Sequence, residues 1–414
     1  MLSPLRRAAW LFVLTACTRG VPSTPAPSPA SPAGRAKAHT SAPHAAPQRA
    51  EQAPPHEAKD GADCPGLPSA SSAQLVDEAW AAVDEGATTR AIACAEAAVE
   101  VAPRSLPALS ARAGALAAAG RVDEARTAYA RALAIDPDDP ETLYGAAEVY
   151  VRHMGSARDV LETGLEHALR GIRSATRRHD RAMAGRLELV AGMAENDLGR
   201  SHLALPHLDR AAAALPDDPD AVYEKGVALF ELCRFDEAQR AFERALALAP
   251  DDPWSLHQLG LLAERRGEDR RATALLAKAR TLAPRDFEPD LQVSPAEFKA
   301  EVDSALASLP VEERRALRSV PIEIQDLPDS ADLLAVRPPL SPSILGLFRG
   351  PSEDEACTPA DGPRCRTIVL YRKNLLRFAR DRRELSEQVK VTLLHELGHL
   401  HGLDDEQLRV RGLE

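Results

Sequence analysis

The stretch AVYEKGVALFELCRFDEAQRAFERALALAP, residues 221–250, predicts a pair of closely packed helices. Gly226, Ala238 and Ala245 stand 24, 12 and 5 residues before its last residue, Pro250. Small side chains at such positions let two neighbouring helix backbones approach each other. The whole chain is rich in alanine and only 4% aromatic, which suits packed helices better than strands.

The same pattern recurs along the chain with a period of 34 residues. The gap of 79 residues between Pro137 and Pro216 fits two repeats with eleven extra residues, so we expect six helical pairs, the third and fourth irregular. The repeated positions are the prolines Pro103, Pro137, Pro216, Pro250 and Pro284, the alanines Ala91, Ala125, Ala204, Ala238, Ala272, Ala98, Ala132, Ala211, Ala245 and Ala279, and the glycines Gly192, Gly226 and Gly260.

This repeat resembles the tetratricopeptide repeat (TPR) family almost position by position. The resemblance implies an all-α TPR solenoid over residues 71–290, with a protein partner on its concave face. Because a fold does not determine its ligand, an array that only spaces its neighbours remains the alternative.

A different kind of sequence begins after the repeats. Ser294, followed by Pro295 and by Glu297 three positions on, has the pattern of a capping box at a helix start. We therefore expect a domain boundary near residue 290 and a small α+β domain over residues 291–414.

Two strands and a long helix are expected in this last domain. The segments 320–324 and 367–372 are β-branched or alternate between apolar and polar residues, which predicts strands. The final long helix is expected from near Arg382 or Glu387 to about His401.

The end of the predicted helix reads HELGHLHGLDDEQ, residues 395–407. His395 and His399 are four positions apart, so they lie on one helix face and can direct ring nitrogens at a single ion. Glu396 lies beside them and need not bind metal, so it can take a proton from water activated by the ion. The pattern predicts a Zn²⁺ site with Glu396 as the catalytic base.

Two imidazoles alone hold zinc poorly, so a third ligand is needed. Gly402 can adopt a left-handed conformation, end the helix and turn the chain back toward the ion. Asp405, three residues further on, is the expected third metal ligand. Its rivals are Asp404, His401 and Glu406.

An amphipathic helix is the simpler alternative for this stretch, with its leucines in the core and its histidines as surface residues. A bare HExxH pattern occurs by chance. The continuation to HExxHxxGxxD favours the metal site.

Four blocks of the last domain resemble, in order, the bacterial zincin-like metallopeptidases, sometimes called minimal zincins. The resemblance implies a compact α+β zincin in which His395, His399 and Asp405 bind zinc, Glu396 acts as base and a peptide or protein is hydrolysed. The blocks are VSPAEFKAEVDSALASLP (293–310), SILGLFRG (343–350), TIVLYRKNLL (367–376) and VKVTLLHELGHLHGLDDEQL (389–408).

The chain departs from that family pattern between the second and third blocks. The stretch SEDEACTPADGPRC, residues 352–365, looks like an elaboration, and Cys357 and Cys365 are possible disulfide partners within it. All four methionines precede residue 200, which excludes the methionine turn of metzincins.

Zincins commonly align a peptide along an edge strand, and the segment 367–372 is the expected one. Possible donors to an oxyanion are Tyr371, Arg372 and Arg377, although each can equally be an ordinary surface residue.

The chain begins MLSPLRRAAWLFVLTACTRG, the pattern of an export signal too short to span a bilayer. Residues 14–17, LTAC, resemble the lipobox of bacterial lipoproteins, which implies a lipid anchor on Cys17 in the cell envelope. The residue after Cys17 is Thr18 and not an aspartate, which favours sorting to the outer membrane. Residues 1–17 are therefore expected to be a signal peptide with a lipobox, and an ordinary signal peptide cleaved nearby is the alternative.

The segment 18–70 is rich in Pro, Ala and Ser and predicts a disordered linker. Export places Cys64, Cys94 and Cys233 in a compartment where disulfides form. The net charge of −11 and the absence of a basic stripe disfavour nucleic-acid binding in this chain of 414 residues.

These expectations combine into an envelope lipoprotein with a TPR interaction domain and a zinc metallopeptidase domain. The competing hypothesis is a TPR scaffold lipoprotein whose zinc site is structural and cleaves nothing. Hydrolysis of a non-peptide amide would use the same residues.

Overall fold

The computed structural model describes residues 64, 70–357 and 365–413. The predicted signal with Cys17 and most of the predicted linker lie outside these residues. The chain divides into two compact units, one formed by residues 46–225 with 247–249 and the other containing residues 226–246 and 250–414. We describe each unit by itself.

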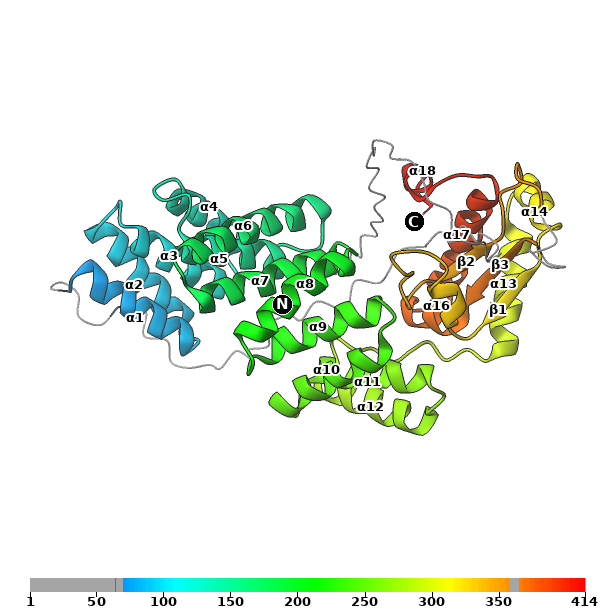
Figure 1. Ribbon diagram of the computed structural model, residues 1–414, viewed down its shortest axis with the longest axis horizontal. Coiled ribbons are helices and arrows are strands. Elements are labelled where there is room, and N and C mark those ends of the chain that lie inside the picture. The colour runs from blue at the N-terminus through cyan, green and yellow to red at the C-terminus, as the bar shows by residue number, and fades with distance from the viewer. Residues whose placement is uncertain (1–63, 65–69, 358–364, 414) are drawn as a thin grey trace, which may run out of the picture. The chain divides into compact units, whose positions relative to one another are not determined.

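Twelve α-helices, α1 to α12, follow one another in the described array and form six consecutive pairs, as the 34-residue period predicts (Figure 1). A π-helical turn, η1, extends α5 in the third pair, which is one of the two pairs expected to be irregular. The elements are α1 (Ser72–Asp84), α2 (Thr88–Val101), α3 (Leu106–Ala118), α4 (Val122–Leu133), α5 (Pro140–Glu148), η1 (Val149–His153), α6 (Arg158–Arg177), α7 (Arg181–Asp197), α8 (Ser201–Ala214), α9 (Pro219–Glu231), α10 (Phe235–Leu248), α11 (Pro253–Arg265) and α12 (Asp269–Leu282).

Glycine at the repeated helix position permits the close approach within a pair. A Cβ atom on Gly192 would lie 2.4 Å from Cγ of Leu208, and one on Gly226 would lie 2.6 Å from Cε1 of Phe242. Both facing residues lie sixteen positions after their glycine, so the 34-residue period repeats the same contact. The period therefore reflects a repeated packing geometry.

A disulfide joins Cys64 to Cys94 on α2 and closes a loop with a sequence separation of 30 residues. Cys94 is fully buried, in a cluster with Ala79 and Ala91. The cross-link stabilises the start of the array, since it restricts the unfolded chain.

The second unit ends in the α+β region expected from the sequence. It contains a three-stranded sheet of order β1-β3-β2, in which β1 is parallel and β2 antiparallel to β3. Its elements are α13 (Pro295–Ser308), α14 (Val311–Leu317), β1 (Ile322–Gln325), α15 (Ser330–Leu333), β2 (Gly346–Arg349), β3 (Thr367–Tyr371), α16 (Arg372–Phe378), α17 (Arg382–Leu400) and α18 (Asp405–Val410).

Both faces of β3 are covered. Ile368 and Leu370 belong to the core formed with α13 and α17. Val369 and Tyr371 belong to a second core, against which Cys233 and Phe235 of the preceding repeats are packed. All five residues of β3 are consequently buried.

The expected position of the edge strand is wrong. The segment predicted as edge strand, 367–372, forms the central strand β3, and β2 lies at an edge of the sheet. A strand that is covered on both faces is a continuous apolar run, as TIVLY is, whereas a strand with one exposed face alternates.

The last repeats also contact the α+β region of the same unit through charged groups. Glu264 of α11 forms ion pairs with Lys373, at 3.2 Å, and with Arg377, both on α16. Arg265 donates a hydrogen bond to the carbonyl of Pro328 at 2.9 Å. The second unit therefore includes the end of the array.

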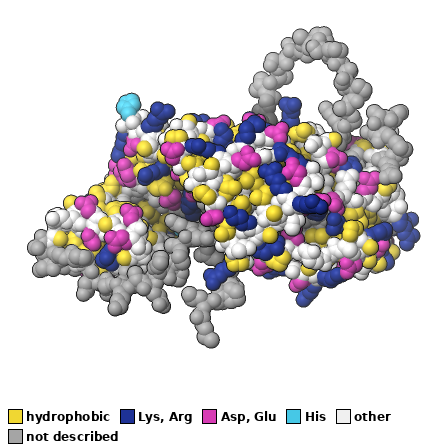
Figure 2. Space-filling view, turned by 90° about the horizontal axis from the view of Figure 1, so that it is seen from below, with side chains coloured by type: hydrophobic (Ala, Val, Ile, Leu, Met, Phe, Trp, Pro, Cys, Tyr) yellow, Lys and Arg dark blue, Asp and Glu magenta, His cyan; other side chains and the backbone are white. Residues whose placement is uncertain are grey.

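Basic and acidic side chains are interspersed on the face drawn in Figure 2. Among the described helices, none combines the length and the apolar composition needed to cross a bilayer.

Candidate metal centre

The helix α17 carries the HExxH motif and is held at both ends. Asp381 caps its start by accepting a hydrogen bond from the Glu384 amide at 2.8 Å. Gly402 follows its end with a φ of 77°, the left-handed conformation expected of a helix stop. These two ends define the position at which the motif is presented.

The side chains of the motif are buried. His395 and His399 are each 3% exposed and Glu396 is fully buried. The alternative of an amphipathic helix with surface histidines is therefore wrong. Its leucines do lie in the core, since Leu393, Leu397 and Leu400 are buried there.

The two histidines and Asp405 meet at one point. His395 Nε2 and His399 Nε2 are 3.0 Å apart, and they lie 3.6 Å and 3.4 Å from Asp405 Oδ1. Nitrogen and oxygen ligands at about 2.0–2.1 Å from a tetrahedral zinc ion lie roughly 3.3 Å from one another. The three described atoms therefore fit around one zinc ion, and they leave a fourth position for water or substrate.

The second nitrogen of each imidazole contacts a backbone carbonyl. His395 Nδ1 donates to the Leu413 carbonyl at 2.6 Å, and His399 Nδ1 donates to the Leu403 carbonyl at 2.9 Å. A proton on Nδ1 leaves a lone pair on Nε2, which is the ligand form of a neutral histidine. Both lone pairs point toward the shared position.

Asp405 reaches the cluster as the first residue of α18, and its side chain is 10% exposed. Its three rivals have other contacts. Asp404 caps α18 by accepting from the Gln407 amide at 2.8 Å. Glu406 contacts Arg409 at 2.9 Å, and His401 contacts Glu353 at 2.6 Å.

Glu396 lies beside the cluster but is not part of it. Neither of its carboxylate oxygens has hydrogen-bond geometry to any described group. Burial raises the pKa of Glu396 to about 8, although the charge of His395 and the nearby Phe348 amide oppose this and the Asp405 charge adds to it. A bound cation would favour its charged form.

Strand β2 covers the carboxylate of Glu396. A Cβ atom on Gly346 would lie 2.5 Å from Cγ2 of Thr392 and 3.0 Å from Oε1 of Glu396. A larger residue at position 346 would therefore displace Glu396 or the strand. Sequence reasoning missed this residue, for which the only signal is a glycine inside an apolar block.

The charges around Glu396 also shift the pKa of His395, its neighbour in the chain. Burial alone would lower the pKa of His395, but contacts with Asp405, Glu396 and the Leu413 carbonyl outweigh burial and raise it. The surroundings of His395 therefore favour positive charge, whether carried by a proton or by a metal ion.

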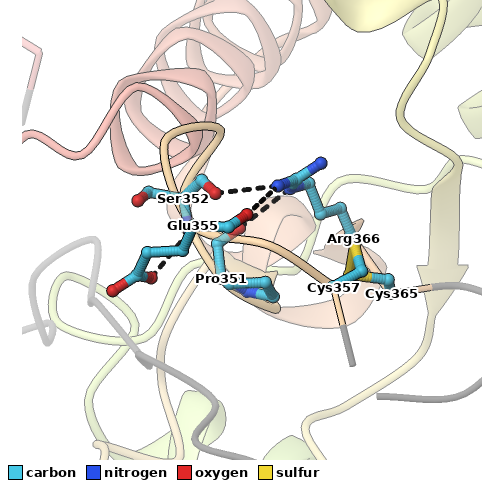
Figure 3. Close-up of a disulfide and its surroundings, with 6 residues drawn as sticks. All are labelled: Pro351, Ser352, Glu355, Cys357, Cys365 and Arg366. Carbon is cyan, nitrogen blue, oxygen red and sulfur yellow. Dashed lines mark hydrogen bonds between the residues drawn. A yellow bond between two sulfur atoms is a disulfide. The ribbon is translucent and has the colours of Figure 1, made fainter. Parts of the chain in front are cut away.

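The elaboration between β2 and β3 is a cross-linked loop (Figure 3). Cys357 and Cys365 form a disulfide in the structure. Arg366 donates to three backbone carbonyls of the loop, those of Pro351, Ser352 and Glu355, at 3.0, 2.9 and 2.6 Å.

This loop meets the end of α17. The Glu353 amide donates to the Leu400 carbonyl at 2.7 Å, and the Glu353 carboxylate contacts His401. One of the last carbonyls of the helix is thereby satisfied. The loop supports the turn that leads to Asp405.

The three possible oxyanion donors are engaged elsewhere. Tyr371 donates to Asp332 at 2.8 Å, and Arg372 donates to Asp326 at 2.8 Å. Arg377 is paired with Glu264. None of the three has a described contact with the cluster.

Comparison with known families agrees with this division of the chain. A family model described as zincin-like metallopeptidase matches residues 317–413. Two models described as tetratricopeptide repeat match residues 76–140, and 116–167 with 197–260. The chain therefore contains TPR repeats followed by a zincin-like metallopeptidase domain, as expected. No curated protein matches it.

Solved structures resemble the array. Pseudomonas aeruginosa pilF is 16% identical, with coverage of 56% of this chain and 97% of that chain and a TM-score of 0.45. PilW, a type IV pilus biogenesis factor, is 19% identical, with coverage of 52% of this chain and 94% of that chain and a TM-score of 0.45. YrrB, a TPR protein with an unusual peptide-binding site, is 22% identical, with coverage of 46% of this chain and 93% of that chain and a TM-score of 0.36. At this level of similarity the comparison concerns only the repeat fold.

Proposed function

We propose that this protein is a zinc metallopeptidase in which His395, His399 and Asp405 hold Zn²⁺ and Glu396 is the catalytic base. The observation that carries the proposal is the meeting of the three ligand atoms beside the fully buried carboxylate of Glu396. A structural zinc site does not need such a carboxylate, whereas hydrolysis does.

The roles of the residues follow from their positions. Zinc, when bound, would polarise a substrate carbonyl and make water more nucleophilic. Glu396 lies next to His395 in the chain and is shielded from solvent, so it would accept the proton of the attacking water and later transfer it to the leaving nitrogen. The edge of the sheet formed by β2 is the proposed place for an extended peptide, because β2 covers Glu396.

Export and a lipid on Cys17 belong to the same proposal. The signal-like start supports an envelope location, most simply the outer membrane. The TPR array would bind a protein partner or the substrate itself. Labelling with a radioactive fatty acid tests the anchor, since the Cys17→Ser chain would lose the label that the unsubstituted chain carries.

The first experiment on the enzyme compares the full-length chain with its Glu396→Gln variant. Both are expected to bind one zinc ion by metal analysis, because Glu396 is not a ligand. Only the unsubstituted chain is expected to cleave a mixed peptide library, with a loss in the variant of about 10²–10⁴-fold, the usual contribution of general acid–base catalysis. Loss of zinc from the Gln variant would contradict the assigned roles.

One observation favours a second function, a scaffold with structural zinc. His395 and His399 are only 3% exposed, so the protein shields the metal position from a substrate, whereas the three candidate ligands leave one coordination position open. For such a scaffold, zinc is present, no library peptide is cleaved, and Glu396→Gln changes neither result.

A further inference from the structure

Three groups of one short segment, residues 403–413, reach the candidate metal centre. Asp405 supplies a candidate ligand, while the carbonyls of Leu403 and Leu413 accept from His399 and His395. The two carbonyls do not touch the ion position. They accept hydrogen bonds from Nδ1 of the imidazoles, the nitrogens that face away from the ion position.

The segment is fastened to α17 by one side chain. Leu408 of α18 is fully buried, and a Cβ atom on Gly398 would lie 2.2 Å from its Cδ2. Because Gly398 has no side chain, Leu408 packs directly against α17 at this position, which lies between His395 and His399 in the sequence. The Leu403 amide also donates to the Gly398 carbonyl at 3.0 Å.

The end of the segment is directed by a left-handed residue. Gly412 has a φ of 71°, a conformation that costs little for glycine and is strained for β-branched residues. Its amide donates to Arg409 at 2.9 Å, and the Leu413 amide donates back to Leu408 at 3.1 Å. This helix-ending turn brings the Leu413 carbonyl to His395.

We propose that residues 403–413 form a positioning clamp, in which the carbonyls of Leu403 and Leu413 hold both histidines with Nε2 facing the proposed metal position. The clamp rests on the proposed zinc binding and adds to it a set of residues that bind no metal themselves. Without the Leu413 carbonyl, the ring of His395 loses its only described Nδ1 contact and can rotate or exchange its proton between the two nitrogens.

The test uses Gly412→Val in the full-length chain, with Gly120→Val as the matched control. Gly120 has a φ of 72° and also ends a helix, its amide donating to Ala117 and the following amide to Leu116. A Cβ atom on either glycine would meet no atom within 4 Å, so both substitutions impose the same backbone strain without a clash. Only Gly412 precedes a carbonyl that contacts a histidine.

We expect Gly412→Val to weaken zinc binding by about 10–100-fold, the usual effect of losing an outer partner of a metal-bound histidine. Chelator competition measures the affinity. The visible spectrum of the Co²⁺-loaded chain is expected to change as well, because it reports ligand geometry. Gly120→Val is expected to leave both unchanged.

Two further variants separate positioning from loss of folding. Gly412→Asn tolerates the left-handed conformation and is expected to restore affinity. Leu408→Ala keeps every backbone acceptor but loosens the clamp, so it is expected to weaken zinc binding in the same direction. Thermal unfolding of each metal-free chain is the check on folding: a midpoint equal to that of the unsubstituted chain attributes a loss of affinity to positioning.

Wild-type affinity and spectrum in Gly412→Val and in Leu408→Ala would overturn the clamp and leave the proposed zinc site intact. Absence of zinc from the unsubstituted chain would overturn the proposed function itself. The two failures are therefore distinct.

Discussion

Asp405 is the residue on which the ligand set depends. It approaches the histidine nitrogens to 3.4 and 3.6 Å, whereas His401 is engaged with Glu353. We predict that Asp405→Ala loses most bound zinc and that His401→Ala retains it, as metal analysis after dialysis would show. Retention of zinc in Asp405→Ala together with its loss in His401→Ala would mean that the third ligand is misassigned.

Residue chemistry made part of this site predictable. The spacing of His395 and His399 and the position of Glu396 follow from helix geometry, so sequence alone places them together. The Leu413 carbonyl could not be predicted, because a backbone acceptor has no residue type and its position depends on the turn at Gly412. The need for glycine at position 346 could not be predicted either, because it arises from the packing of β2 against α17.

Among the elements, those with a long regular pattern were the predictable ones. The six helical pairs follow from a period repeated along the array, and α17 begins at one of the two expected starts. Strand β2 has only four residues and does not alternate between apolar and polar side chains. Its own sequence does not indicate that it pairs with β3. The order of strands in a sheet depends on contacts far apart in the chain, which is why the edge strand was assigned wrongly.

The end of α9 gives a prediction about pH. Burial raises the pKa of Glu231 to about 7 from its ordinary value of 4.5, against the opposing hydrogen bond with Ser341. Between these pH values the unfolded chain releases a proton that the folded chain keeps, so stability falls as pH rises from 4.5 to about 7 and then levels off.

Glu231→Gln removes this penalty. We expect the variant to be more stable than the parent by about 1–3 kcal/mol at pH 8 and nearly equal at pH 4, measured by thermal unfolding at both values. Glu243→Gln, at an exposed position on α10, is the control and should change little at either pH. An equal effect of Glu231→Gln at pH 4 and pH 8 would show that its charge is not the cause.

At the scale of the whole molecule, the second unit begins within the repeats. Phe235 packs against the core that contains Val369 and Tyr371, and the guanidinium of Arg265 lies 4.5 Å from the centre of the Phe235 ring. Together with the ion pairs of Glu264, these contacts link the last repeats to the zincin-like domain.

A fragment comprising residues 291–414 is therefore expected to be less stable than one comprising residues 219–414. Loss of a partly buried aromatic contact and of the ion pairs corresponds to about 2–4 kcal/mol, or roughly 5–10 °C in midpoint. Thermal unfolding followed by circular dichroism measures the difference. Equal midpoints would show that the repeats contribute nothing to the domain.

The closeness in sequence of the groups at the metal centre has a consequence for synthesis. The three candidate ligands and both carbonyl acceptors all fall between His395 and Leu413. A ribosome thus translates the whole TPR array before the first of these groups. A chain released by premature termination before residue 395 would carry the array without any part of the candidate ligand set, so only translation through Leu413 gives a chain with all of these groups.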